Sequence, residues 1–341
     1  MATTPKPGHA ALGRFTSANK EARDRYHADT ARREGASRIL NPNEVSGEYD
    51  AGRLLSTTLG GIERMLTIED LHTFRKNVKA LGKKFKGGIT AKSVIDMSLK
   101  VDRDRSNKEI TMAVPVQLYA GRVHFMTNAG PKSDVTRHHV HIELLNYSAA
   151  ISSPAKPAEL VKMMATGPLK LDCDCGRHTF WYRFIATSGN FNAGRPENGF
   201  PKIRNPNLAG VACKHVLRVM QQLSSPGVRK QLEKMVESGR KGVTPTRTVV
   251  SKAEAKALAD QQAAQTGWKR NQVESNAERQ ARLAQQRGVQ TVVQRSMVKA
   301  KAIAPKMVDA AKKKFIAQAQ KLAAMGVLTA KQLAAMLAKL K

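Results

Sequence analysis

The stretch KLDCDCGRH at residues 170–178 contains two of the chain's three cysteines, and the third opens the triplet CKH at residues 213–215. One residue separates the cysteines of the first stretch, so an extended strand would place both thiols on the same face. The triplet adds a thiol and an imidazole, and four such donors fill the tetrahedral shell of a structural zinc ion. We therefore predict a Zn2+ site with the ligands Cys173, Cys175, Cys213 and His215.

The second pair of ligands stands at the start of a predicted helix. Apolar side chains at positions 216, 219, 220 and 223 have the spacing of one helical face. Residues two apart within a helix diverge by about 200°, so we place Cys213 before the helix and His215 in its first turn. His178, three residues after Cys175, is an alternative fourth ligand. We prefer His215 because it is closer in sequence to its cysteine partner.

This pattern resembles a known family. C-x-C, a variable gap and C-x-H at the start of a helix resemble the SWIM-type zinc fingers, which have a ββα zinc fold and are associated with DNA binding or protein–protein contact. The gap carries FWYRF at 180–184 and PKIRNPN at 201–207, which look like the SWIM-like proteins of tailed bacteriophages. The stretch from 102–110 to 138–143 also looks phage-like, so the resemblance covers about residues 90–223. It implies a phage protein with a ββα element at the metal.

The charge of the chain indicates a polyanionic partner. The sequence has 58 Lys and Arg against 27 Asp and Glu, a formal net charge of +31. Such an excess repels itself in a compact monomer and favours association with nucleic acid or an anionic membrane face. The excess is steepest after residue 223, where 24 basic residues stand against seven acidic ones.

The sequence has no apolar run long enough for a transmembrane helix and no apolar secretory leader at its start. An odd number of clustered cysteines suits metal binding in a reducing compartment better than a disulfide framework. We expect the protein to be made in a cytoplasm.

The expected fold class is α+β: a small zinc-stapled core of mixed sheet and helix with a ββα SWIM-like element, followed by an extended basic helical tail. Strands are predicted over 110–119, 121–126 and 139–144, and a short helix over 157–164. We expect four regions: a polar N-terminal arm at 1–50, the core at 51–223, a basic linker at 224–250, and a basic Ala/Lys/Gln-rich helical tail at 251–341.

A longer helix is predicted to start after Thr67, whose hydroxyl can cap it, and to end at the glycines 87–88. Its apolar residues follow a helical stripe from Leu71 to Phe85. Lysines occupy the other positions, namely Lys76, Lys79, Lys83, Lys84 and Lys86. Two interpretations stay open: a solvated basic face or a surface that contacts a polyanion.

The end of the chain reads as a helical hairpin over 306–325 and 329–340. One apolar stripe in its first helix is formed by Val308, Ala311, Phe315, Ala319 and Leu322. The stripe either packs against the second helix or docks on a partner or a membrane surface. The triplet Lys312, Lys313 and Lys314 is a second candidate for nucleic-acid contact.

The sequence signals for other kinds of functional site are weaker than the signal for the zinc site. His139 and His141 share a strand face and would suit a second metal, but such histidines more often line a polar sheet surface. Residues 180–184 would alternate along a strand, with aromatics that either stack on bases or fill the core; core packing is preferred. Phosphate loops, dinucleotide fingerprints and nucleophile elbows are missing from the sequence. Four protein ligands leave zinc no open position for catalysis, so we expect no enzyme.

The sequence therefore predicts a non-enzymatic, zinc-binding basic protein of a tailed phage, carried in the virion with the genome as a structural or ejected protein. Its expected partners are nucleic acid, chiefly DNA without sequence preference, and other virion proteins or copies of itself through the helical tail. The alternative is an accessory of phage DNA metabolism, or a nonspecific DNA-binding protein, in the host cytoplasm.

Overall fold

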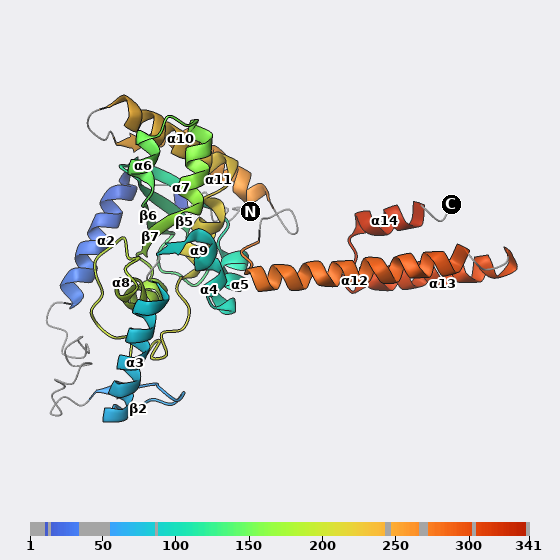
Figure 1. Ribbon diagram of the computed structural model, residues 1–341, viewed down its shortest axis with the longest axis horizontal. Coiled ribbons are helices and arrows are strands. Elements are labelled where there is room, and N and C mark those ends of the chain that lie inside the picture. Colours follow the sequence, from blue (N-terminus) through green and yellow to red (C-terminus); the bar gives the residue numbers. More distant parts are fainter. Residues whose placement is uncertain are drawn as a thin grey trace, which may run out of the picture. The chain divides into compact units, whose positions relative to one another are not determined.

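The computed structural model describes residues 11–12, 15–33, 55–85, 88–242, 247–265, 272–301 and 305–338 (Figure 1). The chain divides into two compact units, Met1–Ser275 and Asn276–Lys341. Both are rich in helix, and the sheets lie in the first unit, so the protein is α+β as expected.

The first unit is built on a six-stranded antiparallel sheet with the strand order β3-β7-β6-β5-β4-β8. The three predicted central strands are present as β4, β5 and β6. Pro115 coincides with a register shift in β4. The six strands are β3 (Ile89–Thr90), β4 (Ala113–Tyr119), β5 (Arg122–Asn128), β6 (Arg137–Leu144), β7 (Pro168–Cys173) and β8 (Thr248–Val249). A separate two-stranded sheet joins β1 (Ser56–Thr57) to β2 (Arg64–Met65).

Helices surround this sheet, and their bounds are as follows. The first unit contains α2 (Ala18–Arg33), α3 (Ile68–Lys84), α4 (Ala91–Met97), α5 (Lys100–Glu109), α6 (Tyr147–Ser152), α7 (Pro157–Thr166), η3 (His178–Tyr182), α8 (Arg183–Ser188), α9 (Lys214–Gln222), α10 (Pro226–Lys241) and α11 (Lys252–Ala264), with the short turn η1 (Phe15–Ser17) before α2. The second unit contains α12 (Asn276–Lys301), α13 (Pro305–Ala324) and α14 (Ala330–Ala338).

The two faces of the central sheet differ in chemistry. One face is apolar, because Val140, Ile142 and Leu144 of β6 lie beside Leu169, Leu171 and Cys173 of β7. Helix α9 packs on this face. The opposite face is polar: alternation places His124, His141 and Asp172 in one row across β5, β6 and β7.

The predicted helix after Thr67 is present as α3. The Thr67 hydroxyl accepts the backbone N–H of Asp70, and the Asp70 carboxylate accepts the N–H of Thr67, which is a capping box. Arg64 reinforces this end with two hydrogen bonds of 2.6 and 2.7 Å to the same carboxylate. Leu71, Phe74 and Leu81 are buried as the periodicity predicts.

The prediction of a linker at 224–250 is wrong for most of this range. Helix α10 occupies Pro226–Lys241 and buries Val228, Leu232, Met235 and Val236 in the core. These residues have helical spacing, but Pro226, Gly227 and the neighbouring basic residues have the composition of a linker.

The core continues beyond α10. Helix α11 packs against β4, where the Gln262 amide donates to the backbone carbonyl of Ala113 at 3.0 Å and accepts its N–H at 2.7 Å. The first unit therefore extends to Ser275, and the helical tail is α12 to α14.

The N-terminal arm also differs from expectation where it is described. Helix α2 docks on the polar face of the sheet through polar contacts rather than an apolar stripe. Asn19 donates to Gln117 at 2.5 Å, and Arg25 donates to Asp174 at 2.6 Å. Residues 1–10, 13–14 and 34–50 of the expected arm lie outside the described residues.

In the second unit the two predicted helices of the hairpin are present as α13 and α14. Phe315 and Ala319 of the predicted stripe are buried, and Leu322 is half-buried. The side chains of Val308 and Ala311 lie outside the described part.

We predict that Leu232→Ala destabilises the protein by about 2–5 kcal/mol, because the substitution leaves a cavity in a fully buried site. Urea unfolding would measure the change, with Lys230→Ala on the exposed side of α10 as the matched control, for which we expect less than about 0.5 kcal/mol. Equal stabilities for the two variants would contradict the assignment of α10 to the core.

Candidate metal centre

Cys173, Cys175, Cys213 and His215 lie together at the junction of β7 and α9. Their ligand atoms are all within 4.8 Å of one another, and all four side chains are buried. The structure thus brings together the four residues that the spacing singles out. Among the described residues, no other group of His, Cys, Asp or Glu lies close enough to hold a metal ion.

Each pair of ligands is positioned as its local sequence dictates. Cys173 is the last residue of β7, opposite Val140 in β6, and its alternation in the strand points it to the apolar face. Cys175 follows in a turn, where its sulfur accepts the backbone N–H of His178 at 3.4 Å. Cys213 is the N-cap of α9, and His215 lies in the first turn. The helix therefore presents both of its ligands to the strand end.

The distances fit a tetrahedral ion. Nδ1 of His215 lies 4.0 Å from the sulfur of Cys173 and 4.0 Å from that of Cys213. Ideal zinc bonds of about 2.3 Å to sulfur and 2.0 Å to nitrogen would place these atoms about 3.6 Å apart. These two pairs would need to contract by a few tenths of an ångström, and all the ligand atoms lie within 4.8 Å of one another, so the donor set is compatible with zinc.

Helix α9 is held in place by polar contacts on the side that faces α5. Lys214 pairs with Glu109 at the end of α5. Arg218 is almost fully buried and donates to the backbone carbonyl of Ser106 at 2.9 Å. These contacts to α5 offset the free-energy cost of burying two cations on one short helix. They also fix the position of His215, which lies between Lys214 and Arg218 in the sequence.

The cysteine side chains shift one another's pKa values. Burial raises the pKa of the Cys173 thiol well above its usual value, and the sulfurs of Cys175 and Cys213 raise it further. Burial would also raise the pKa of Cys213, but hydrogen bonds from the other two cysteines and the backbone N–H groups of α9 lower it well below its usual value. Burial lowers the pKa of His215, which keeps its imidazole neutral. The lowered pKa of Cys213 and the neutral imidazole of His215 both favour the deprotonated forms that bind a metal cation.

His178 is not part of this group. Its Nε2 lies 3.2 Å from a carboxylate oxygen of Asp172, which also accepts from Arg183 at 3.0 Å. Asp172 lies on the polar face of the sheet, away from the apolar face that carries Cys173. The imidazole of His178 thus belongs to an ion-pair group next to the candidate ligands.

The segment between the ligand pairs is helical, which corrects the ββα expectation. Residues 178–188 form η3 and α8 instead of a returning strand, so the SWIM-like element is not shown. Helical spacing buries Tyr182 and Ile185 together, and the Tyr182 hydroxyl and Arg177 both donate to the buried carboxylate of Asp102. Trp181 lies between the guanidinium groups of Arg177 and Arg204, at 4.3 and 5.3 Å from its ring centroid. The alternation in FWYRF is typical of a strand. The partners of this segment in the helical form, Asp102 and Arg204, lie elsewhere in the sequence.

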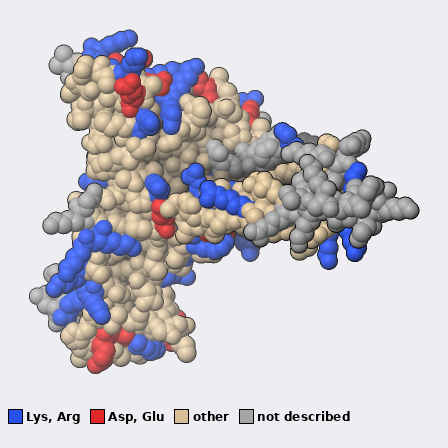
Figure 2. All heavy atoms as spheres, turned by 45° about the vertical axis from the view of Figure 1, so that its right-hand side comes forward, with Lys and Arg blue, Asp and Glu red and all other residues tan. Residues whose placement is uncertain are grey.

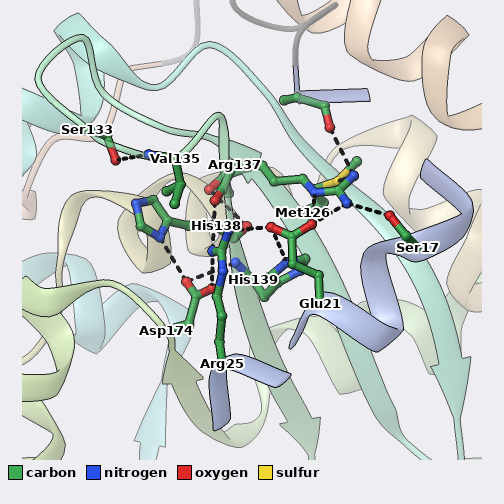
Figure 3. Close-up of polar contacts among 12 residues, drawn as sticks. Ser17, Glu21, Arg25, Met126, Ser133, Val135, Arg137, His138, His139 and Asp174 are labelled. Carbon is green, nitrogen blue, oxygen red and sulfur yellow. Dashed lines mark hydrogen bonds and ion pairs between the residues drawn. The ribbon is translucent and has the colours of Figure 1, made fainter. Parts of the chain in front are cut away.

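A polar network joins the candidate metal centre to α2, and Figure 3 shows its members pointing toward one another. Asp174 stands between two candidate ligands and accepts from His138 at 2.9 Å and from the backbone of His139 at 3.1 Å. Glu21 of α2 accepts from Arg137 at 2.8 Å. No local pattern marks this network, because Glu21 lies 116 residues from Arg137 and His138 lies 36 residues from Asp174.

The histidines of β6 contact one another and their neighbours in and around this network. His139 Nδ1 lies 3.0 Å from Nε2 of His124, and the ring of His124 stacks on that of His141 at 4.5 Å. The His138 ring lies 4.3 Å from that of His215. His139 and His141 line the polar sheet face, which agrees with the preferred interpretation.

The lysines singled out as nucleic-acid contacts lie on two units. Lys76, Lys79, Lys83 and Lys84 are exposed along α3, and Lys86 is outside the described residues. On α13, Lys313 and Lys314 are exposed and Lys312 is half-buried.

Comparison of the chain with family models, curated proteins and solved structures finds no match. None of the described helices combines the length and the apolar character that crossing a membrane requires.

We predict that purified protein binds about one zinc ion per chain and that Cys213→Ser or His215→Ala lowers the zinc content substantially, measured by elemental analysis after dialysis. His178→Ala is the matched control and should retain the ion, because its ring faces Asp172. Zinc should be released as the pH falls, because protons compete for the thiolates. Full zinc content in His215→Ala together with loss of zinc in His178→Ala would identify His178 as the fourth ligand instead.

The pair of His138 and Asp174 gives a second prediction. Burial would lower the pKa of His138, but the hydrogen bond to Asp174 and its charge raise the pKa above 6.5. The pKa of Asp174 is held well below its usual range, against burial, chiefly by His138. The pair therefore stabilises the fold most between about pH 4 and 6.5. Its contribution falls below this window as Asp174 is protonated and above it as His138 loses its proton.

In an NMR titration, Asp174→Asn should drop the His138 pKa below 6.5, because the substitution removes the two largest effects that oppose burial, the hydrogen bond and the charge of Asp174. His141, whose pKa burial lowers, is the internal reference. An unchanged His138 pKa in the variant would contradict the assigned cause.

Proposed function

We propose that the protein is a zinc-binding, non-enzymatic protein that binds nucleic acid through the basic face of α3. The observation that carries the proposal is the charge of the C-terminal half of this helix. Residues 75–84 contain Arg75 and four lysines and no acidic residue.

The apolar residues of α3 hold the basic face outward. Phe74 and Leu81 are buried, Phe74 stacks on Phe200 at 4.1 Å, and Asn77 donates to the backbone carbonyl of Pro206. With this side fixed, Lys76, Lys79, Lys83 and Lys84 are exposed. In Figure 2, Lys and Arg side chains gather on the lower part of the molecule, at the height of α3 in Figure 1. Lysines along a rigid helix suit contacts to successive phosphates.

The metal centre supports a structural role for zinc in this proposal. Three cysteines and one histidine fill a tetrahedral shell, so an ion there has no open position for water or substrate. Zinc would fix α9 and β7 to one another and so keep the core rigid beneath α3.

The resemblance to SWIM-like proteins of tailed phages supports a role beside a phage genome. In one form the protein is carried in the virion, and α13 and α14 assemble it with other virion proteins or with its own copies. In the other form it acts as a nonspecific DNA-binding accessory in the host cytoplasm. The two roles differ in whether purified particles contain the protein in stoichiometric amounts.

We predict that replacing Lys76, Lys79, Lys83 and Lys84 by alanine weakens binding to a short DNA duplex and flattens its salt dependence. Contact with about six phosphates gives a slope of log K against log salt on the order of −5, and loss of four contacts should reduce its magnitude by about 3 to 4. Fluorescence anisotropy at several salt concentrations would measure both quantities.

The matched control replaces four exposed lysines elsewhere in the first unit, namely Lys92, Lys108, Lys132 and Lys230. It removes the same charge and should leave most of the slope intact. An equal loss in both variants would show that only net charge matters. No binding of the wild-type protein to duplex or single-stranded DNA would refute the proposal.

A further inference from the structure

A cavity of about 630 Å³ lies between α2 and the polar face of the central sheet. Asn19, Arg23 and Tyr26 of α2 form one side, and Tyr119 and Arg122, at the end where β4 turns into β5, belong to the other. The loop carrying Arg195 and the residue Arg247, just before β8, complete the wall. The volume is in the range of pockets that hold a small organic ligand.

The lining of this cavity has an excess of guanidinium groups. Four arginines contribute to it, Arg23, Arg122, Arg195 and Arg247, against the two carboxylates Glu143 and Asp172. Burial lowers the pKa of both lining histidines, so neither adds a positive charge at neutral pH. The cavity is therefore cationic and suited to an anion.

Part of this positive charge is already paired and part is not. Arg195 donates to Asp29 at 2.7 Å, and Arg122 lies 3.3 Å from Glu143. Arg23 and Arg247 form no ion pair with the described residues. The Nε of Arg195 is buried and has no hydrogen-bond acceptor in the described part of the chain. Unused planar donors of this kind match the oxygens of a phosphate group.

Two tyrosines give the same cavity flat apolar surfaces. Tyr26 and Tyr119 are 47% and 41% exposed, although both belong to packed elements. Exposed aromatic rings next to arginines are the combination that binds a planar base and its phosphate together. The loop at Gly194 passes so close to Asp172 that a Cβ would collide with the carboxylate. Glycine at this position thus allows the wall beside Arg195.

We propose that this cavity is a nucleotide-binding site, in which the arginines take the phosphate and the tyrosines contact the base. The nucleotide is either free or a unit of a single strand, since both present the same groups. The proposal does not depend on the basic face of α3, because none of the lysines of α3 lines the cavity.

The test is calorimetric titration of the full-length, zinc-loaded protein with AMP, adenosine, inorganic phosphate and a 5′-phosphorylated hexathymidylate. We expect AMP to bind more tightly than adenosine or phosphate alone. The double variant Arg23→Ala/Arg247→Ala should weaken AMP binding by about 10- to 100-fold, the usual effect of losing charged hydrogen bonds. Tyr26→Ala should weaken AMP more than inorganic phosphate.

The matched control is Lys76→Ala/Lys79→Ala, which removes two charges outside the cavity and should leave AMP affinity unchanged. Circular dichroism and zinc content would verify that each variant is folded. Displacement of AMP by the hexamer would identify a strand as the source of the nucleotide, and failure to displace it would identify the free nucleotide.

Three results would overturn the proposal: no AMP binding by the wild-type protein, equal affinity for adenosine and AMP, or equal weakening by the lysine control. Weak duplex binding by the α3 variant together with normal AMP binding would separate this site from the proposed function.

Discussion

The burial of three thiols and an imidazole at one point between β7 and α9 constrains the rest of the first unit. Polar groups in an apolar core need partners, and these four have mainly one another. The surrounding elements all contribute to holding them there. β6 pairs with the strand that ends at Cys173, α5 holds the helix that begins after Cys213, and α2 contacts Asp174 between the two cysteines of the strand end. A bound cation would turn this polar cluster from a cost of folding into a cross-link.

The elements that the sequence predicts well are those whose signals are local. Thr67 and Asp70 form the expected cap, the central strands follow their alternation, and Cys213 precedes its helix because residues two apart cannot converge inside one. The approach of the four candidate ligands was predictable for the same reason, since metal-ligand spacing is a property of short segments.

The failures lie where distant partners decide. Tyr182 lies in a helical segment and donates its hydroxyl to Asp102, which is eighty residues away. Helix α2 has no apolar stripe and is held by Arg137 and Asp174, which no local pattern reveals. The linker was predicted from a proline, a glycine and positive charge, although Leu232 and Met235 bury a face. Tertiary contacts outweighed local composition in each case.

The return of the chain to β4 after residue 223 imposes an order on synthesis. Gln262 satisfies the backbone of Ala113, which the ribosome makes 149 residues earlier, and β8 closes the edge of β4. All four candidate ligands are synthesised before these segments. During that interval the edge of β4 has unpaired backbone groups, which are a template for wrong pairing. A metal ion captured by the nascent chain would fix the strand and helix at the centre of the core while its last layer is still being translated.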